Sequence, residues 1–145
     1  MGITLELTKE AFRRTDGNDV DGFVELQAPD CVWETPDGTL EGRAAVREYF
    51  AAWHEGFADS RHEILRSYEP DESTVVVVGR FNGTHGGTLP TPAGDVPPTG
   101  RRVNVRFCLL VEGDVAARQA KRITLYMDQV ALMAQLGLLP EPVQA

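Results

Sequence analysis

The stretch RITLYMDQVALMAQLGLLP, residues Arg122–Pro140, changes its hydrophobic period in the middle. Up to Met127, apolar and polar residues alternate, which is typical of a strand with two different faces. After Asp128 the apolar residues recur at helical spacing, and Gly137 followed by Pro140 forms a helix stop signal. The stretch therefore predicts a strand that leads into a helix, with Asp128 at the junction.

Asp128 has two interpretations at this position. Aspartate is a preferred N-cap residue, so its carboxylate can serve the helix alone. A carboxylate among apolar neighbours is also a candidate acid/base group, because poor solvation raises the pKa of a carboxyl group. The junction by itself favours the capping role, and the rest of the chain provides the support for a catalytic role.

The composition predicts one globular domain over residues 1–145, with 42% hydrophobic and 25% charged residues. A net charge of -8 argues against nucleic acid or an anionic membrane as a partner. No apolar run approaches the roughly 20 residues of a membrane helix, and the N-terminus lacks the apolar core of a signal peptide. Cys31 and Cys108 each lie in an apolar run, which predicts buried thiols in a cytoplasmic protein.

The first half of the chain predicts three helices. The first covers residues 4–15, and the second begins after Asn18 or Asp19. The third is the clearest, because its apolar residues follow the spacing of one helical face. That face is formed by Val46, Tyr49, Phe50, Trp53 and Phe57.

The second half predicts strands. Residues 61–68 and 74–84 are separated by a turn sequence and indicate a hairpin, in which Val75–Val78 is apolar on both faces. A proline-rich loop is expected at 86–100, followed by a long strand at 101–111. Helices followed by strands indicate an α+β domain with helices on one face of a largely antiparallel sheet.

Several chemistries have no support in the sequence. There is no Walker loop and no Gly-x-Ser-x-Gly elbow. His54, His62 and His85 lack metalloprotease spacing, and no cysteine pair indicates a zinc site. Asp128, His85 and many apolar residues remain. That set suits proton transfer on a hydrophobic substrate without a metal or other cofactor.

Five segments taken together resemble the SnoaL-like polyketide cyclase family. They occur in the right order over nearly the whole chain, and they are Pro29–Trp33, Gly56–Asp59, Gly79–Gly87, Pro98–Val103 and Asp128 with the downstream Gln135–Gly137. The resemblance implies a nuclear-transport-factor-2-like cone, in which three N-terminal helices pack on a curved, mostly antiparallel sheet around an apolar cavity. It also implies intramolecular aldol ring closure of an aromatic polyketide, with Asp128 as acid/base.

The resemblance and the aromatic residues together define the expected site. His85 either assists Asp128 by orienting the substrate or satisfies backbone groups at its strand end. Apolar walls for the substrate are expected from Trp33, Trp53, Phe57, Phe107, Leu109 and Tyr126.

Three departures from the family leave other functions open. Leu109 falls where the aklanonic and nogalonic ester cyclases carry a histidine, and Trp33 and Phe107 stand where polar groups are usual. The alternatives are a non-catalytic small-molecule binding protein of the same fold, and a proton-transfer enzyme like ketosteroid isomerase. The apolar outer face of the predicted sheet indicates a homodimer, or an interaction module as a third function.

Overall fold

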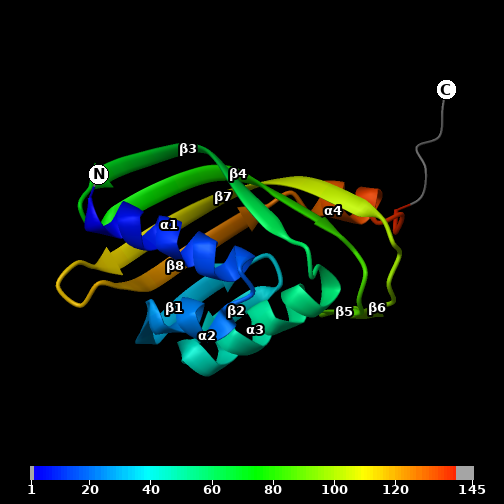
Figure 1. Ribbon diagram of the computed structural model, residues 1–145, viewed down its shortest axis with the longest axis horizontal. Coiled ribbons are helices and arrows are strands. Elements are labelled where there is room, and N and C mark those ends of the chain that lie inside the picture. The colour runs from blue at the N-terminus through cyan, green and yellow to red at the C-terminus, as the bar shows by residue number, and fades with distance from the viewer. Residues whose placement is uncertain (1, 140–145) are drawn as a thin grey trace.

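A strongly curved six-stranded sheet arches over three helices, which cover its inner face (Figure 1). The computed structural model describes residues 2–139. The elements in chain order are α1 (Ile3–Asp16), α2 (Val20–Glu25), β1 (Gln27–Thr35), β2 (Gly38–Glu41), α3 (Gly42–Gly56), β3 (Arg61–Asp71), β4 (Thr74–Thr84), β5 (Leu89–Thr91), β6 (Gly94–Val96), β7 (Arg102–Asp114), β8 (Gln119–Met127) and α4 (Gln129–Gln135).

The strand order of the sheet is β2-β1-β8-β7-β4-β3. The β1–β8 pair is parallel, and the other neighbouring pairs are antiparallel. This arrangement confirms the α+β class and the mostly antiparallel sheet. No helix among the described residues is both long enough and apolar enough to cross a membrane.

The opening stretch folds as its periodicity predicts. Strand β8 ends at Met127, Asp128 is the N-cap residue, and α4 begins at Gln129. Gly137 follows the helix with a φ of +76°, in the left-handed region that favours glycine. Pro140, the other predicted stop residue, lies outside the described residues.

The two faces of the sheet follow from strict alternation along β4 and β7. Val75 and Val77 are fully buried on the inner face, whereas Val76 and Val78 are half-buried on the outer one. Strand β4 lies between β7 and β3, so the predicted hairpin and the interior position of Val75–Val78 are confirmed. On β7 the buried face is the one formed by every second residue from Val103 to Val111.

Three predictions of detail need correction. The proline-rich segment 86–100 contains a short hairpin, β5–β6, which turns at Gly94 with a φ of +120°. The third helix ends at Gly56, so Phe57 is its C-cap residue rather than its last turn. Cys108 is only half-buried because it lies on the outer face of β7, whereas Cys31 is buried as predicted.

Gly79 allows an aromatic side chain to lie across the inner face of the sheet. It pairs with Phe107 of the neighbouring strand β7. A Cβ atom at residue 79 would approach Cζ of Phe107 to 2.7 Å and would collide with the carbonyl oxygen of Glu63. The position of the Phe107 ring therefore depends on the absence of a side chain at Gly79.

Gly79→Ala is expected to lower the free energy of unfolding by about 1–3 kcal/mol, because β3 or the Phe107 ring must move. Gly86→Ala is the matched control, since a Cβ there has its nearest neighbour at 3.9 Å. Urea unfolding of both variants measures the difference. Equal stabilities would contradict the assigned packing at Gly79.

Candidate functional site

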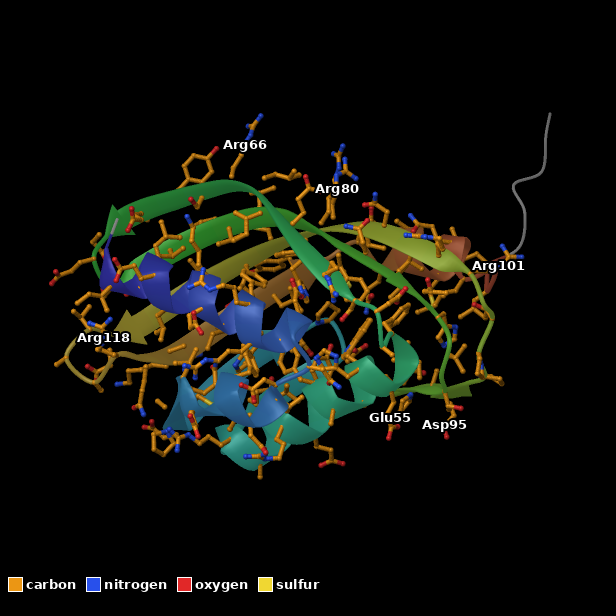
Figure 2. All side chains as sticks on the ribbon, viewed as in Figure 1. Glu55, Arg66, Arg80, Asp95, Arg101 and Arg118 are labelled. Carbon is orange, nitrogen blue, oxygen red and sulfur yellow. The ribbon has the colours of Figure 1, made fainter. Side chains whose placement is uncertain are left out.

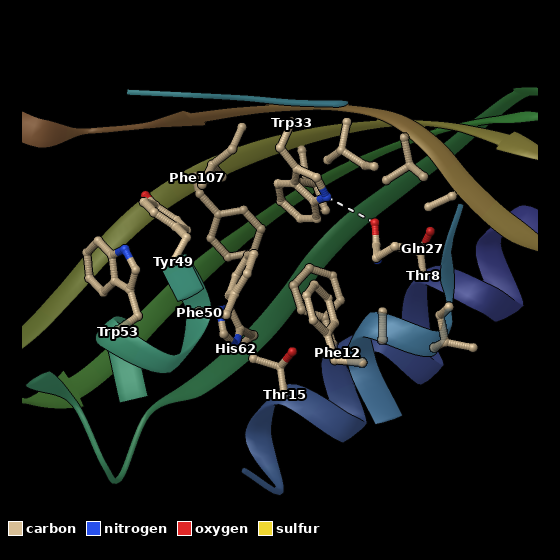
Figure 3. Close-up of a pocket in the computed structure, with 18 of the residues that line it drawn as sticks. Thr8, Phe12, Thr15, Gln27, Trp33, Tyr49, Phe50, Trp53, His62 and Phe107 are labelled. Carbon is tan, nitrogen blue, oxygen red and sulfur yellow. Dashed lines mark hydrogen bonds between the residues drawn. The ribbon is translucent and has the colours of Figure 1, made fainter. Parts of the chain in front are cut away.

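A cavity of about 90 Å³ lies between the inner face of the sheet and helices α1, α2 and α3 (Figure 3). A buried water needs roughly 10–15 Å³ of such space, so the cavity has room for several water molecules or a small ligand. Its lining is almost entirely apolar and comprises Leu7, Thr8, Ala11, Phe12, Thr15, Phe23, Leu26, Gln27, Trp33, Tyr49, Phe50, Trp53, His54, Ser60, His62, Phe81, Phe107, Leu109, Val111, Ala120, Ile123, Leu125 and Met127.

Aromatic rings in tilted or edge-on contact give the cavity its shape. Phe50 is in contact with both Phe23 and Trp33, with ring centroids 4.7 Å and 5.1 Å apart. Trp53 packs edge-on against Phe81 at 5.5 Å. Such pairs hold the rings in fixed orientations and present flat apolar walls to the space between them.

His62 and Asp16 form the main polar contact at the cavity. His62 is the second residue of β3, and Asp16 is the last residue of α1. Nδ1 of His62 lies 2.6 Å from Oδ1 of Asp16, and the backbone N–H of His62 donates to Oδ2 at 3.0 Å. Since a carboxylate only accepts, Nδ1 carries the proton in the neutral ring and Nε2 is left with a free lone pair.

The surroundings of His62 are poorly hydrated. Its ring lies 5.1 Å from Phe12, 5.4 Å from Phe81 and 5.8 Å from Phe107, measured between ring centroids. The side chains of His62 and Asp16 are 14% and 20% exposed. An imidazole held by a carboxylate at the wall of an apolar cavity is suited to accept a proton and return it.

His54 brings a second imidazole to the same cavity from helix α3. Its Nδ1 is buried and has no hydrogen-bond partner among the described residues. Burial lowers the pKa of His54 below its ordinary value of 6.5, and the charge of His62 lowers it further against the opposing effect of Asp16. His54 is therefore favoured in its neutral form near a histidine that has an anionic partner.

Two other polar side chains of the lining, Trp33 and Tyr49, donate hydrogen bonds to neighbours in the protein. Trp33 Nε1 donates to Gln27 Oε1 at 3.0 Å, and the Tyr49 hydroxyl donates to Asp37 at 2.9 Å. Burial, followed by the charge of Asp37, raises the pKa of Tyr49, so this phenol stays protonated. Figure 3 shows Gln27 and Thr8 toward one end of the cavity and Tyr49 and Trp53 toward the other.

The predicted substrate-binding residues separate into two groups. Trp33, Trp53, Phe107 and Leu109 belong to the cavity lining. Phe57 is fully buried behind it, stacked on Trp53 at 5.4 Å, and Tyr126 is 64% exposed on the outer face of the sheet. Contact of a ligand with Phe57 or Tyr126 would require a different site from this cavity.

Asp128 is placed outside the cavity lining, and its side chain is exposed. Its Oδ1 accepts the backbone N–H of Ala131 at 3.0 Å, which is the bond of an N-cap residue. The expectation that this carboxylate faces an enclosed apolar pocket is thus corrected. The physical reason is strand alternation: Met127 points into the cavity, so the next residue points away from it.

His85 is not among the residues that line the cavity either, and the ring of Phe57 lies between it and Trp53. It is fully buried at the end of β4, where Nδ1 accepts the backbone N–H of Thr99 at 3.2 Å. Its own backbone bonds to Gly100 and Arg101 tie the end of the 86–100 segment to the sheet. These contacts are those of the structural alternative, in which His85 satisfies backbone groups at the strand end.

Sequence reasoning did not select His62, Asp16 or His54. One signal was available, since His62 and Ile64 occupy alternate positions of a predicted strand and so share a face. Asp16 carried no such signal, because it lies 46 residues from His62 in sequence. Among residues 2–139 no group of three or more His, Cys, Asp or Glu side chains is arranged to hold a metal ion.

A curved sheet covered by helices on one face, with an apolar cavity between the layers, defines the nuclear-transport-factor-2-like or ketosteroid-isomerase-like fold. The model of the SnoaL-like domain family matches residues 8–114, and the chain belongs to this family. No curated protein sequence matches the chain.

Solved structures of the same fold align over almost the whole chain. A proposed SnoaL-like polyketide cyclase from Jannaschia sp. CCS1 is 22% identical, with a TM-score of 0.79 over 95% of this chain and 94% of its own. AclR, a proposed hydroxylase from Streptomyces galilaeus, is 20% identical, with a TM-score of 0.80 over 95% and 87%. TerC, crystallised with polyporic acid, is 19% identical, with a TM-score of 0.72 over 94% and 99%.

The buried His85 predicts a pH dependence of stability. Burial, partly offset by the backbone of Gly87, lowers its pKa below the ordinary 6.5. As the pH falls below about 6.5, the unfolded chain takes up a proton that the folded chain resists, so the free energy of unfolding decreases. The loss begins near the unfolded pKa and is complete below the folded one.

We expect His85→Gln to show a smaller loss of stability between about pH 7.5 and about pH 5 than the wild type. His54 has the same sign and leaves part of the loss in place. The carboxyl groups of Asp59 and Glu10 also have lowered pKa values, but their ordinary values of 3.8 and 4.5 lie below this window. Urea midpoints at both pH values are the measurement, and an unchanged difference would rule out a buried neutral His85.

Proposed function

We propose that this chain is an enzyme of the SnoaL-like polyketide cyclase type that closes a ring by proton transfer on a hydrophobic, ketone-bearing substrate. The acid/base group in this proposal is Nε2 of His62, oriented by Asp16. The observation that carries it is the 2.6 Å contact between Asp16 and a histidine that lines an apolar cavity. Membership of the SnoaL-like family supports the reaction class.

The proposed aldol step conserves atoms and electrons. Nε2 of His62 accepts a proton from a carbon next to a carbonyl group, and the electron pair delocalises as an enolate. The enolate carbon attacks a second carbonyl carbon of the same molecule and forms the new carbon–carbon bond. The imidazolium then returns its proton to the resulting alkoxide.

In this proposal Asp16 orients the ring of His62 and stabilises its protonated form. It holds Nδ1–H through Oδ1 and the backbone of residue 62 through Oδ2, so the ring has one defined direction. Its negative charge stabilises the imidazolium that forms when His62 takes up the proton. The low dielectric between Phe12, Phe81 and Phe107 strengthens that charge interaction.

Two further functions fit the same cavity. A non-catalytic binding protein would use the aromatic walls of the cavity and no proton transfer, and TerC with polyporic acid supports small-molecule binding in this fold. A ketosteroid-isomerase-like enzyme would use the same base for a proton shift within one substrate. The second candidate differs from ring closure only in the fate of the enolate.

Nitrobenzisoxazole provides a test that needs no knowledge of the natural substrate, because its ring opens when a base removes a proton from carbon. His62→Gln is expected to lower the rate of opening by roughly 10²–10⁴-fold, the range of a lost general base. Asp16→Asn should lower it as well, since the amide no longer fixes the tautomer of His62.

Asp128→Asn is the comparison that separates the two candidate bases. Full activity in Asp128→Asn with loss in His62→Gln supports His62, and the reverse pattern would restore the catalytic hypothesis for Asp128. Equal rates in the wild type and both variants would favour the binding protein. Thermal midpoints measured alongside show whether a loss of rate comes from unfolding.

A homodimer through the outer face of the sheet is the assembly that we propose. Cross-strand pairs place apolar residues in two adjacent rows on this face, namely Tyr68, Val76 and Leu110, and Val78, Cys108 and Tyr126. Arginines flank the rows, and Figure 2 shows Arg66 and Arg80 directed outward from the sheet. Two such faces attract through their apolar rows and repel through their arginines.

Association is therefore expected to strengthen as salt screens the arginines, contrary to the usual weakening of ion-paired interfaces. Tyr126→Lys should shift a dimer toward monomer, since it removes an exposed ring and adds charge of the same sign. Ala58→Lys, at an exposed position after α3, is the control. Sedimentation of the wild type and both variants at micromolar concentration measures the oligomeric state. A wild-type monomer at every salt concentration would refute the dimer.

A further inference from the structure

Gln27 is the most deeply buried side-chain amide at the cavity. The residue is 2% exposed, begins strand β1 and belongs to the cavity lining. An amide buried among apolar groups is unfavourable unless both its oxygen and its nitrogen find partners. The hydrogen-bond partners of Gln27 therefore indicate which polar group of a ligand could bind in the cavity.

The indole of Trp33 determines how the Gln27 amide is oriented. Its Nε1–H is a donor only, and it lies 3.0 Å from Oε1 of Gln27. The oxygen must therefore face Trp33, because the reverse orientation would set two donors against each other. Figure 3 shows this bond at the end of the cavity near Thr8.

The amide nitrogen of Gln27 has no partner in the part of the chain that the structure describes. No hydrogen bond among residues 2–139 has Nε2 of Gln27 as its donor. The backbone carbonyl of Gln27 is occupied by Arg43 Nε at 2.8 Å. Two N–H groups are thus available at the wall of an apolar cavity.

We infer that Nε2 of Gln27 donates a hydrogen bond to a carbonyl oxygen of the ligand, and that the ligand class is an apolar ketone. This inference rests on the proposed function and deepens it, because proton removal next to a carbonyl places negative charge on that oxygen. A neutral, pre-oriented N–H donor stabilises such an oxyanion without adding a charge to the cavity. Gln27 is then a specificity-determining residue for the ketone.

The probes for this inference are α-tetralone and tetralin, which share a bicyclic skeleton and differ in one carbonyl oxygen. The wild type is expected to bind α-tetralone more tightly than tetralin by about 2- to 10-fold, the value of one net hydrogen bond. In Gln27→Met the preference should vanish, while binding of tetralin stays near the wild-type value.

Two further variants guard against a merely structural effect. Trp33→Phe keeps Gln27 but removes the donor that orients it, so the preference for α-tetralone should fall there too. Leu125→Met alters the same lining without touching a polar group and should leave the preference unchanged. Tetralin binding reports a folded cavity in each variant, so Trp33→Phe carries the test if Gln27→Met does not fold.

The carbonyl stretch of bound α-tetralone gives a direct readout. It should lie at lower frequency in the wild type than in Gln27→Met, because a hydrogen bond weakens the C=O bond. Equal frequencies together with an unchanged preference would overturn the role of Gln27. Tetralone binding does not depend on proton transfer, so a failure of the proposed catalysis appears in the ring opening of nitrobenzisoxazole and a failure of this inference appears in the tetralone preference.

Discussion

Helix α1 is fixed to the β3–β4 hairpin at both of its ends, and the cavity depends on this constraint. At its C-terminus Asp16 makes two hydrogen bonds to His62, and Arg61 donates to the carbonyl of Asp16 at 3.0 Å. At its N-terminus the Thr4 hydroxyl donates to the carbonyl of Glu72 at 2.6 Å. A helix tied at two points bridges the curved sheet instead of sinking into it, and the side chains beneath it leave space.

The same contact that positions the helix also orients the imidazole of the proposed base. A carboxylate that served only to anchor α1 could bond to backbone N–H groups alone. Asp16 instead uses one oxygen for the backbone of His62 and the other for its ring, so anchoring the helix and orienting the imidazole are one event. Under the proposed mechanism, substituting Asp16 therefore affects stability and catalysis together, whereas substituting His62 leaves the backbone bond in place.

The local pattern of apolar and polar residues was sufficient to predict the helices and strands, but it was not sufficient to predict the residues of the candidate site. The change of period at Asp128 predicted β8 and α4 correctly, because it depends on residues adjacent in sequence. The same alternation also indicates that Asp128 faces away from the cavity. Ile123, Leu125 and Met127 all line the cavity, so the residue that follows Met127 lies on the other side. The Asp16–His62 pair was beyond this reasoning, because it requires knowing how α1 crosses the sheet.

The chemistry of the cavity depends on which inward-facing residues are polar. In this chain the polar inward-facing residues do not occupy the positions implied by the resemblance to the aklanonic and nogalonic ester cyclases. Leu109, where those enzymes carry a histidine, is indeed inward-facing on β7 and brings no proton-transfer group. The imidazoles instead come from His62 on β3 and His54 on α3. The backbone supports either arrangement, because any strand that curves around the cavity presents every second residue to it. An inward histidine on β3 instead of β7 needs only one inward residue to change on each strand, and a role for it as a base needs an acidic partner within reach. Asp16 meets that last condition, so the proposed base His62 needs no polar group at Leu109 or Phe107.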